Sequence, residues 1–94
     1  MKRPVDYRTA RIVMDDRAGD FEAARRLAEQ EAEALLGMPM LIAWCDAVRA
    51  EESPRVPECT GEPGWLAYAK GHGIHLLVDV NGGDYQFAYT DAAA

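Results

Sequence analysis

The chain has 94 residues, of which 49% are hydrophobic, and its formal net charge at pH 7 is −6. This length fits one domain, and the hydrophobic content excludes a disordered chain. The acidic balance argues against binding to nucleic acid, because contact with a phosphate backbone needs a basic face. We therefore expect a single folded domain over residues 1–94, with residues 1–5 and 91–94 frayed.

Sequence features that direct a chain to membranes or out of the cell are lacking. No apolar run approaches the roughly 18 residues of a membrane span, and the first residues lack the apolar core of a signal peptide. Two cysteines without an export signal predict reduced thiols in a cytoplasmic protein. Residues 1–26 hold seven basic and five acidic side chains, net +2, whereas residues 27–94 hold three and eleven, net −8. The four cations nearest the N-terminus form either a small basic patch or the solvated side of a strand, and they are Lys2, Arg3, Arg8 and Arg11.

The first predicted elements are a strand and a long helix. Residues 7–14 alternate well enough for a strand, and the arginines that interrupt the alternation favour an edge or half-exposed position. Residues 15–19 form a turn, Asp20 is a good N-cap, and residues 21–36 are rich in helix formers. Gly37 and Pro39 then end the helix. One apolar stripe runs along it, made of Phe21, Ala24, Leu27, Ala28, Ala32 and Leu35.

The middle of the chain is more ambiguous. Residues 40–50 are predicted to be a strand that continues toward Glu51, although a helix is not excluded. The strand places Ile42, Trp44 and Asp46 on one face and Leu41, Ala43 and Cys45 on the other. Residues 53–65 hold three prolines and two glycines, so they predict a stiff loop. A short helix follows, beginning near Pro63 and ending at the glycines of residues 71–73.

The last elements form a β-hairpin. Residues 74–80 and 84–90 alternate in hydrophobicity, and the Asn-Gly-Gly between them is a strong turn signal. The core faces of these two strands consist of Ile74, Leu76, Val78, Val80, Tyr85, Phe87 and Tyr89.

Together the elements predict an α+β domain of order β-α-β-loop-α-β-β. Its sheet has four strands, mostly antiparallel, and carries the long helix on one face. One sheet face is then uncovered, and homodimerisation is the commonest way to cover such a face. We therefore expect a non-catalytic homodimeric module that binds a small ligand or a protein partner.

The open face and the proline-rich loop supply the candidate binding residues. A tryptophan, two carboxylates, a histidine and an amide on one face suit either a small polar ligand or a dimer interface. The face contributes Trp44, Asp46, His75, Asp79 and Gln86, and the loop and short helix add Glu58, Cys59, Trp65 and Tyr68.

An alternative is a thiol-dependent enzyme or metal-binding protein. Cys59 would be the nucleophile, His72 or His75 its base, and Glu58 or Asp79 would orient that base. No local signature supports this arrangement. The spacing of the cysteines and histidines departs from that of structural zinc sites, and the Asp-Val-Asn-Gly-Gly-Asp run lacks the glutamate of a calcium loop. We expect no metal and no cofactor.

The C-terminal half resembles a family of uncharacterised bacterial and archaeal proteins known as a domain of unknown function. The resemblance covers about residues 40–90 and rests on four runs, LIAWCD, SP…PEC, PGW..YAK..G and LLVDVNGGDYQFAY. It implies a compact α+β domain without an assigned activity. The residues that it singles out are Asp46, Ser53, Pro54, Glu58, Cys59, Gly64, Trp65, Tyr68, Asp79 and Tyr85.

Overall fold

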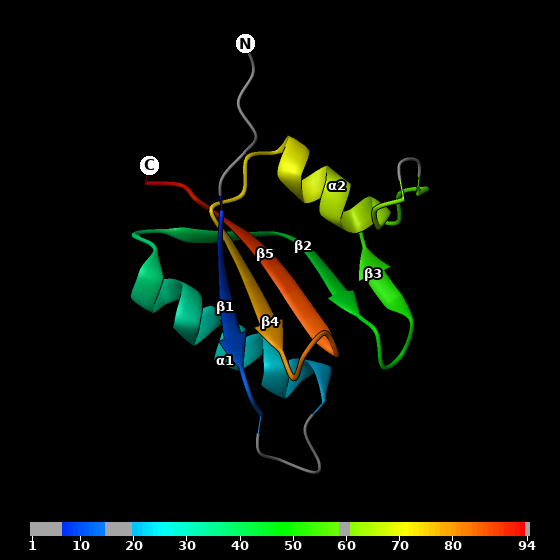
Figure 1. Cartoon of the computed structure of the whole chain (residues 1–94). Coiled ribbons are helices and arrows are strands. Elements are labelled where there is room, and N and C mark those ends of the chain that lie inside the picture. The colour runs from blue at the N-terminus through cyan, green and yellow to red at the C-terminus, as the bar shows by residue number, and fades with distance from the viewer. Residues whose placement is uncertain (1–6, 15–19, 59–60, 94) are drawn as a thin grey trace.

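The computed structural model describes residues 7–14, 20–58 and 61–93 (Figure 1). These residues form an α+β domain with two helices and one sheet, which confirms the predicted class. The elements in chain order are β1 (Arg8–Ile12), α1 (Phe21–Leu35), β2 (Pro39–Asp46), β3 (Glu51–Ser53), α2 (Gly64–Gly71), β4 (Leu76–Val80) and β5 (Tyr85–Asp91). No helix in these ranges is long and apolar enough to cross a membrane.

The sheet has five strands in the order β1-β4-β5-β2-β3, so the prediction of four strands was wrong. β1 runs parallel to β4, and the other neighbours are antiparallel. The additional strand arises because the segment after residue 40 is not one strand. A carboxylate oxygen of Asp46 accepts a hydrogen bond from the N–H of Arg49 at 3.1 Å, and Ala50 adopts a φ of +57°. The chain therefore reverses after Asp46 and returns as β3.

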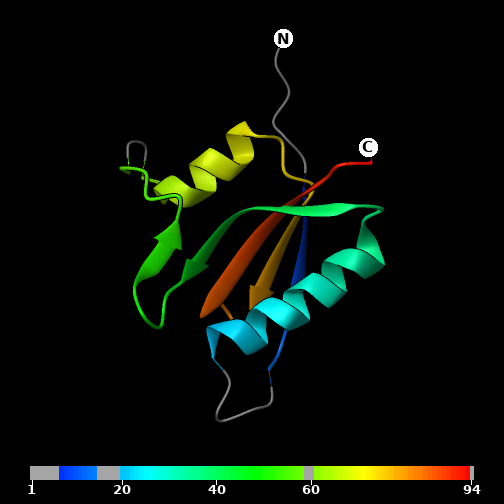
Figure 2. The same ribbon diagram turned by 180° about the vertical axis from the view of Figure 1, so that it is seen from behind.

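Helix α1 covers one face of the sheet, as Figure 2 shows. Its N-cap is confirmed, because an Asp20 carboxylate oxygen accepts from the N–H of Ala23 at 3.0 Å. The three residues of α1 that are fully buried are all alanines, which lets the helix axis approach the sheet closely. These alanines pack with the predicted core faces of β4 and β5, which include Leu76, Val78 and Phe87.

Helix α2 lies on the opposite face of the sheet, which we had expected to be uncovered. Trp65 and Ala69 of α2 are buried against Ala43, Leu77 and Ala88 from three different strands. The reason is that the second face also carries apolar side chains, because β4, β5 and β2 are central strands. The helix covers only part of this face, and the lower ends of the strands extend beyond it (Figure 1).

The β4–β5 hairpin is confirmed, and its turn also holds β1 in place. Asn81, Gly82 and Gly83 all adopt positive φ values, of +58°, +65° and +105°. Asn81 donates its backbone N–H to the carbonyl of Ile12 at 2.8 Å, and its side-chain oxygen accepts from Met14 at 2.7 Å. The turn therefore fixes the end of β1 against the end of β4.

Of the C-terminal residues 91–94, which were expected to fray, residues 91–93 are described and take part in hydrogen bonds. β5 continues through Asp91, and the N–H of Ala92 donates to the carbonyl of Met38 at 2.8 Å. The Asp91 carboxylate accepts from the N–H groups of Gly37 and Met38, at 3.1 and 2.9 Å. The predicted turn at 15–19, the frayed residues 1–5 and residue 94 lie outside the described residues.

Candidate functional site

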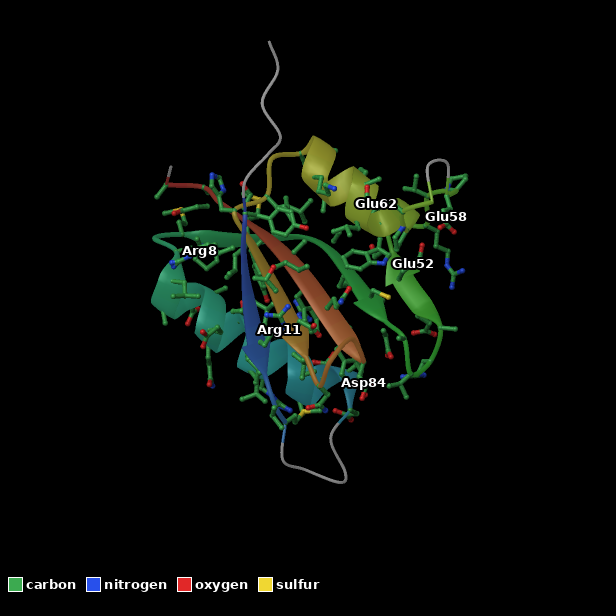
Figure 3. The ribbon with its side chains drawn as sticks, viewed as in Figure 1. Arg8, Arg11, Glu52, Glu58, Glu62 and Asp84 are labelled. Carbon is green, nitrogen blue, oxygen red and sulfur yellow. The ribbon has the colours of Figure 1, made fainter. Side chains whose placement is uncertain are left out.

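The α2-side face of the sheet carries a row of polar side chains below the helix. The strand registers place one residue of each strand in this row, so it crosses the whole sheet. In strand order the row consists of Arg11, Asp79, Gln86, Cys45 and Glu52. Figure 3 shows the arginines of β1 on one side of the molecule and the labelled carboxylates of β3 and of the loop before α2 on the other. The two edges of the sheet therefore differ in charge.

Only part of the predicted ligand site comes together on this face. Asp79 and Gln86 are directly paired across the β4–β5 ladder, as expected. His75 immediately precedes β4. Its Nδ1 accepts from the N–H of Asp91 at 3.0 Å and lies 3.2 Å from the hydroxyl of Thr90. Its Nδ1 is thus occupied by β5.

Trp44 and Asp46 are on the opposite face, contrary to our expectation. The register pairs Trp44 with Phe87 and Asp46 with Tyr85, which both belong to the α1-side core. The Trp44 ring lies 4.6 Å from the ring of Phe21 in α1, measured between centroids. A register shift between Leu41 and Ala43 breaks the simple alternation of β2. Trp44 and Asp46 therefore serve the core and do not join the other predicted ligands.

The predicted contributions from α2 and its preceding loop are spread out. Trp65 is 2% exposed and fills the space between α2 and the sheet. Tyr68 stacks on His72 with a ring separation of 4.2 Å, and the Nδ1–H of His72 donates to the carbonyl of Tyr68 at 2.9 Å. Glu58 is exposed in the loop. The contacts of Tyr68 and His72 close the C-terminal end of α2. Trp65 is not accessible to a ligand because it is buried.

The proposed nucleophile Cys59 lies outside the described residues. The thiol that is described, Cys45, lies half-buried on the polar row. Burial, together with the charges of Glu52 and Asp46, raises its pKa, while a side-chain hydrogen bond with Trp65 lowers it. A raised thiol pKa is the reverse of what nucleophilic catalysis needs.

Two carboxylates, one on this face and one in the loop before α2, are engaged in local structure. An Asp79 oxygen accepts from the N–H of Gly83 at 2.6 Å, which closes the hairpin turn. Glu62 forms an ion pair with Lys70 of α2 at 2.7 Å. Over residues 7–14, 20–58 and 61–93, no group of three His, Cys, Asp or Glu side chains is placed to hold a metal, and no cavity occurs.

The outer edge of β1 is the feature that our sequence reasoning did not treat as a site. The N–H of Arg8 donates to the carbonyl of His75 at 3.0 Å, and the carbonyl of Ile12 accepts from Asn81. In a parallel pair of strands, every second residue hydrogen-bonds to the partner strand through both its N–H and its C=O. The backbone groups of the even-numbered residues of β1 therefore point toward β4. The backbone groups of Thr9, Arg11 and Val13 consequently point outward. No other described strand lies beyond β1, and Val13 is 83% exposed.

The predicted edge position of residues 7–14 was the available signal for this site, and the order of the strands confirms it. The opposite edge is less suited to strand pairing. β3 has three residues, carries Glu51 and Glu52, and is followed directly by Pro54. Short, charged strands next to proline are poor templates for a further strand.

The described residues define a small α+β domain built on a mixed sheet, with the five-residue strand β1 at one edge. Residues 7–89 match the family model described as domain of unknown function DUF5619. The chain belongs to this family, which confirms the resemblance noted in its C-terminal half and extends it over β1 and α1.

One solved structure shares the fold over almost its whole length. It is the crystal structure of a protein from Archeoglobus fulgidus that is described as novel, with a TM-score of 0.76 and 23% sequence identity. The match covers 92% of this chain and 95% of that one. A search of curated proteins finds no match.

Proposed function

We propose that this protein is a non-catalytic binding module whose binding surface is the outer edge of β1. The observation that carries the proposal is the outward orientation of the backbone groups of Thr9, Arg11 and Val13. Each of these residues offers a donor and an acceptor at the border of the sheet. An extended strand satisfies such groups by continuing the ladder, which is a common mode of peptide recognition.

The charge around this edge favours a strand that is neutral or acidic. Residues 7–14 contain two arginines and no acidic residue, in a chain whose net charge is −6. Arg8 shares the register position of Leu76, and Arg11 that of Asp79, so the two guanidinium groups flank the edge on opposite faces of the sheet. Acidic side chains on either face of an added strand would therefore meet a cation.

Amide hydrogen exchange with two peptide probes tests the proposal. The probes are a peptide with the sequence of residues 7–13 and an alternating Thr-Glu peptide of the same length. Protection of the Thr9, Arg11 and Val13 amides by either probe, or by raising the protein concentration, is the expected result. The amides of Ala10 and Ile12 are the internal control, because they already face β4. Unchanged exchange at all three outward amides in every condition would contradict the proposal.

A further inference from the structure

The outward backbone groups of β1 can pair with those of a second β1, although both strands carry two arginines. Building on the proposed binding edge, we infer that two copies pair their β1 strands antiparallel around a two-fold axis at Ala10, joining two five-stranded sheets into one. The dimer interface then lies at the edge of the sheet, whereas the sequence led us to expect it on an uncovered face. Helix α2 stands on part of that face, so a second sheet cannot pack flat against the whole of it.

Pairing of two copies brings like charges together at either edge of the sheet, and at the β1 edge an opposite charge, Asp79 of β4, stands beside Arg11. Contact at the β3 edges would bring Glu51 and Glu52 of both copies together. Contact at the β1 edges brings together the stretch of residues 7–14, in which every charge is positive. Asp79 is the register partner of Arg11 on β4, so a carboxylate stands beside each of the two arginines closest to the axis.

The positions of the arginines select the register. A two-fold axis at Arg11 would set the two Arg11 side chains directly opposite one another, which is unfavourable. An axis at Ala10 sets Arg11 opposite Thr9 of the second copy instead. It also pairs the whole stretch of residues 7–13, whereas an axis at Ile12 pairs only residues 10–14 of the described chain.

The side chains at the Ala10-centred interface are compatible on both faces. Ala10 packs with the α1-side core, so the smallest side chain of β1 lies at the axis on that face. On the α2 side, Val13 would meet Tyr7 of the second copy. Val13 is 83% exposed in the single chain, and the ring of Tyr7 would cover it. The pairing thus covers the most exposed large apolar residue of the described chain.

Ala10 of each copy forms a non-hydrogen-bonded pair in this arrangement, because its own backbone groups face β4. The Cα atoms of such pairs are about 4.5 Å apart, which lies within the range that a disulfide spans. A cysteine at this position reports the register directly. Ile12 would lie opposite Arg8 of the second copy, so two cysteines at position 12 would be too far apart to join.

The test is oxidative cross-linking of Ala10→Cys and Ile12→Cys, each in a Cys45→Ser, Cys59→Ser background, beside the native mass of the unmodified protein. The inference predicts a dimer mass and a covalent dimer for A10C but not for I12C. Cross-linking of I12C alone, or a dimer in which neither variant cross-links, overturns the inferred register and contact.

A monomer at all concentrations also overturns the inference of a second copy, and the peptide probes then separate the two claims. If the Thr-Glu peptide protects the outward amides of a monomer, the binding edge stands and the second copy fails. If no probe protects them, both claims fail.

Discussion

The side-chain oxygen of Asn81 accepts a hydrogen bond from the backbone N–H of Met14 at 2.7 Å, although 67 residues separate them. The same residue donates its own N–H to Ile12 and turns the chain with a φ of +58°. Asn81 therefore bonds to the end of β1 through both its backbone and its side chain, and it also forms part of the turn after β4. The end of the edge strand is thus hydrogen-bonded to a residue of the β4–β5 turn.

Replacing Asn81 should separate its two roles. Asn81→Gly keeps the positive φ but loses the hydrogen bond to Met14, whereas Asn81→Ala loses the hydrogen bond and adds backbone strain. We expect Asn81→Ala to lower the free energy of unfolding by about 1–3 kcal/mol, and Asn81→Gly by less. Urea denaturation of both variants measures this. Equal losses for the two variants would show that the backbone conformation contributes nothing.

Gly64 is required by the close approach of α2 to the preceding loop. A Cβ atom at this position would overlap the backbone carbonyl oxygen of Val56, whereas one at Gly71 would meet open space. Gly64→Ala should therefore destabilise the fold by about 1–3 kcal/mol. Gly71→Ala is the matched control on the same helix, and it should be neutral or stabilising by up to about 1 kcal/mol. A Gly64→Ala variant as stable as the wild type in thermal unfolding would refute this account of the loop.

Asp91 should make stability depend on pH in the acid range. Backbone hydrogen bonds from Ala93, Met38 and Gly37 hold the pKa of its carboxyl below the ordinary value. A lowered folded-state pKa means that the unfolded chain binds the proton more tightly. The stabilisation is therefore complete above the unfolded pKa, near 4, and is lost as the pH falls through the folded pKa.

Unfolding titrations of wild type and Asp91→Asn between about pH 2 and 6 measure this contribution. The wild type should lose more stability than the variant as the pH falls, because the amide does not titrate. Parallel curves for the two proteins would mean that the three N–H groups do not stabilise the carboxylate.

The Cys45 thiol should react slowly. Its raised pKa leaves less thiolate near neutral pH than free cysteine has, and its burial limits access. In a Cys59→Ser variant, which isolates this thiol, alkylation by iodoacetamide at pH 8 should be slower than that of free cysteine. It should reach the rate of free cysteine in urea. Faster alkylation of the folded variant would contradict the raised pKa and revive a catalytic interpretation of this thiol.

Local patterns in the sequence predicted the features that depend on residues close together in the chain. The Asp20 cap and the Asn81-Gly82-Gly83 turn each act within a few residues, and both are present. The apolar stripe of α1 is buried at its three alanines, whereas Leu35 is 38% exposed. The β2–β3 reversal was missed because it uses Ala50 at a positive φ, where no glycine signals a turn. Local patterns also do not reveal which face of the sheet a helix covers.

That limit explains the errors in the candidate site. Trp44 and Asp46 alternate correctly within their strand, but the pairing of β2 with β5 turns them toward α1. The face of a strand is set by its partner, which lies some 40 residues away in this case. Similarly, the arginines that interrupt the alternation of residues 7–14 predicted an edge or half-exposed strand, whereas the outward direction of Thr9, Arg11 and Val13 depends on the register with β4.

A proline at position 11 would block pairing at the outer edge of β1. The N–H of Arg11 points away from β4, so Arg11→Pro removes a donor from the outer edge while leaving the ladder within the chain intact. Arg11→Ala is its control, because it removes the charge but keeps the N–H. The measurement is sedimentation equilibrium of wild type and both variants over a range of concentrations, with urea denaturation to show that each is folded.

We expect wild type and Arg11→Ala to associate, whereas Arg11→Pro should remain a folded monomer. Association of Arg11→Pro to the same extent as wild type would contradict the claim that the β1 edge is the binding surface.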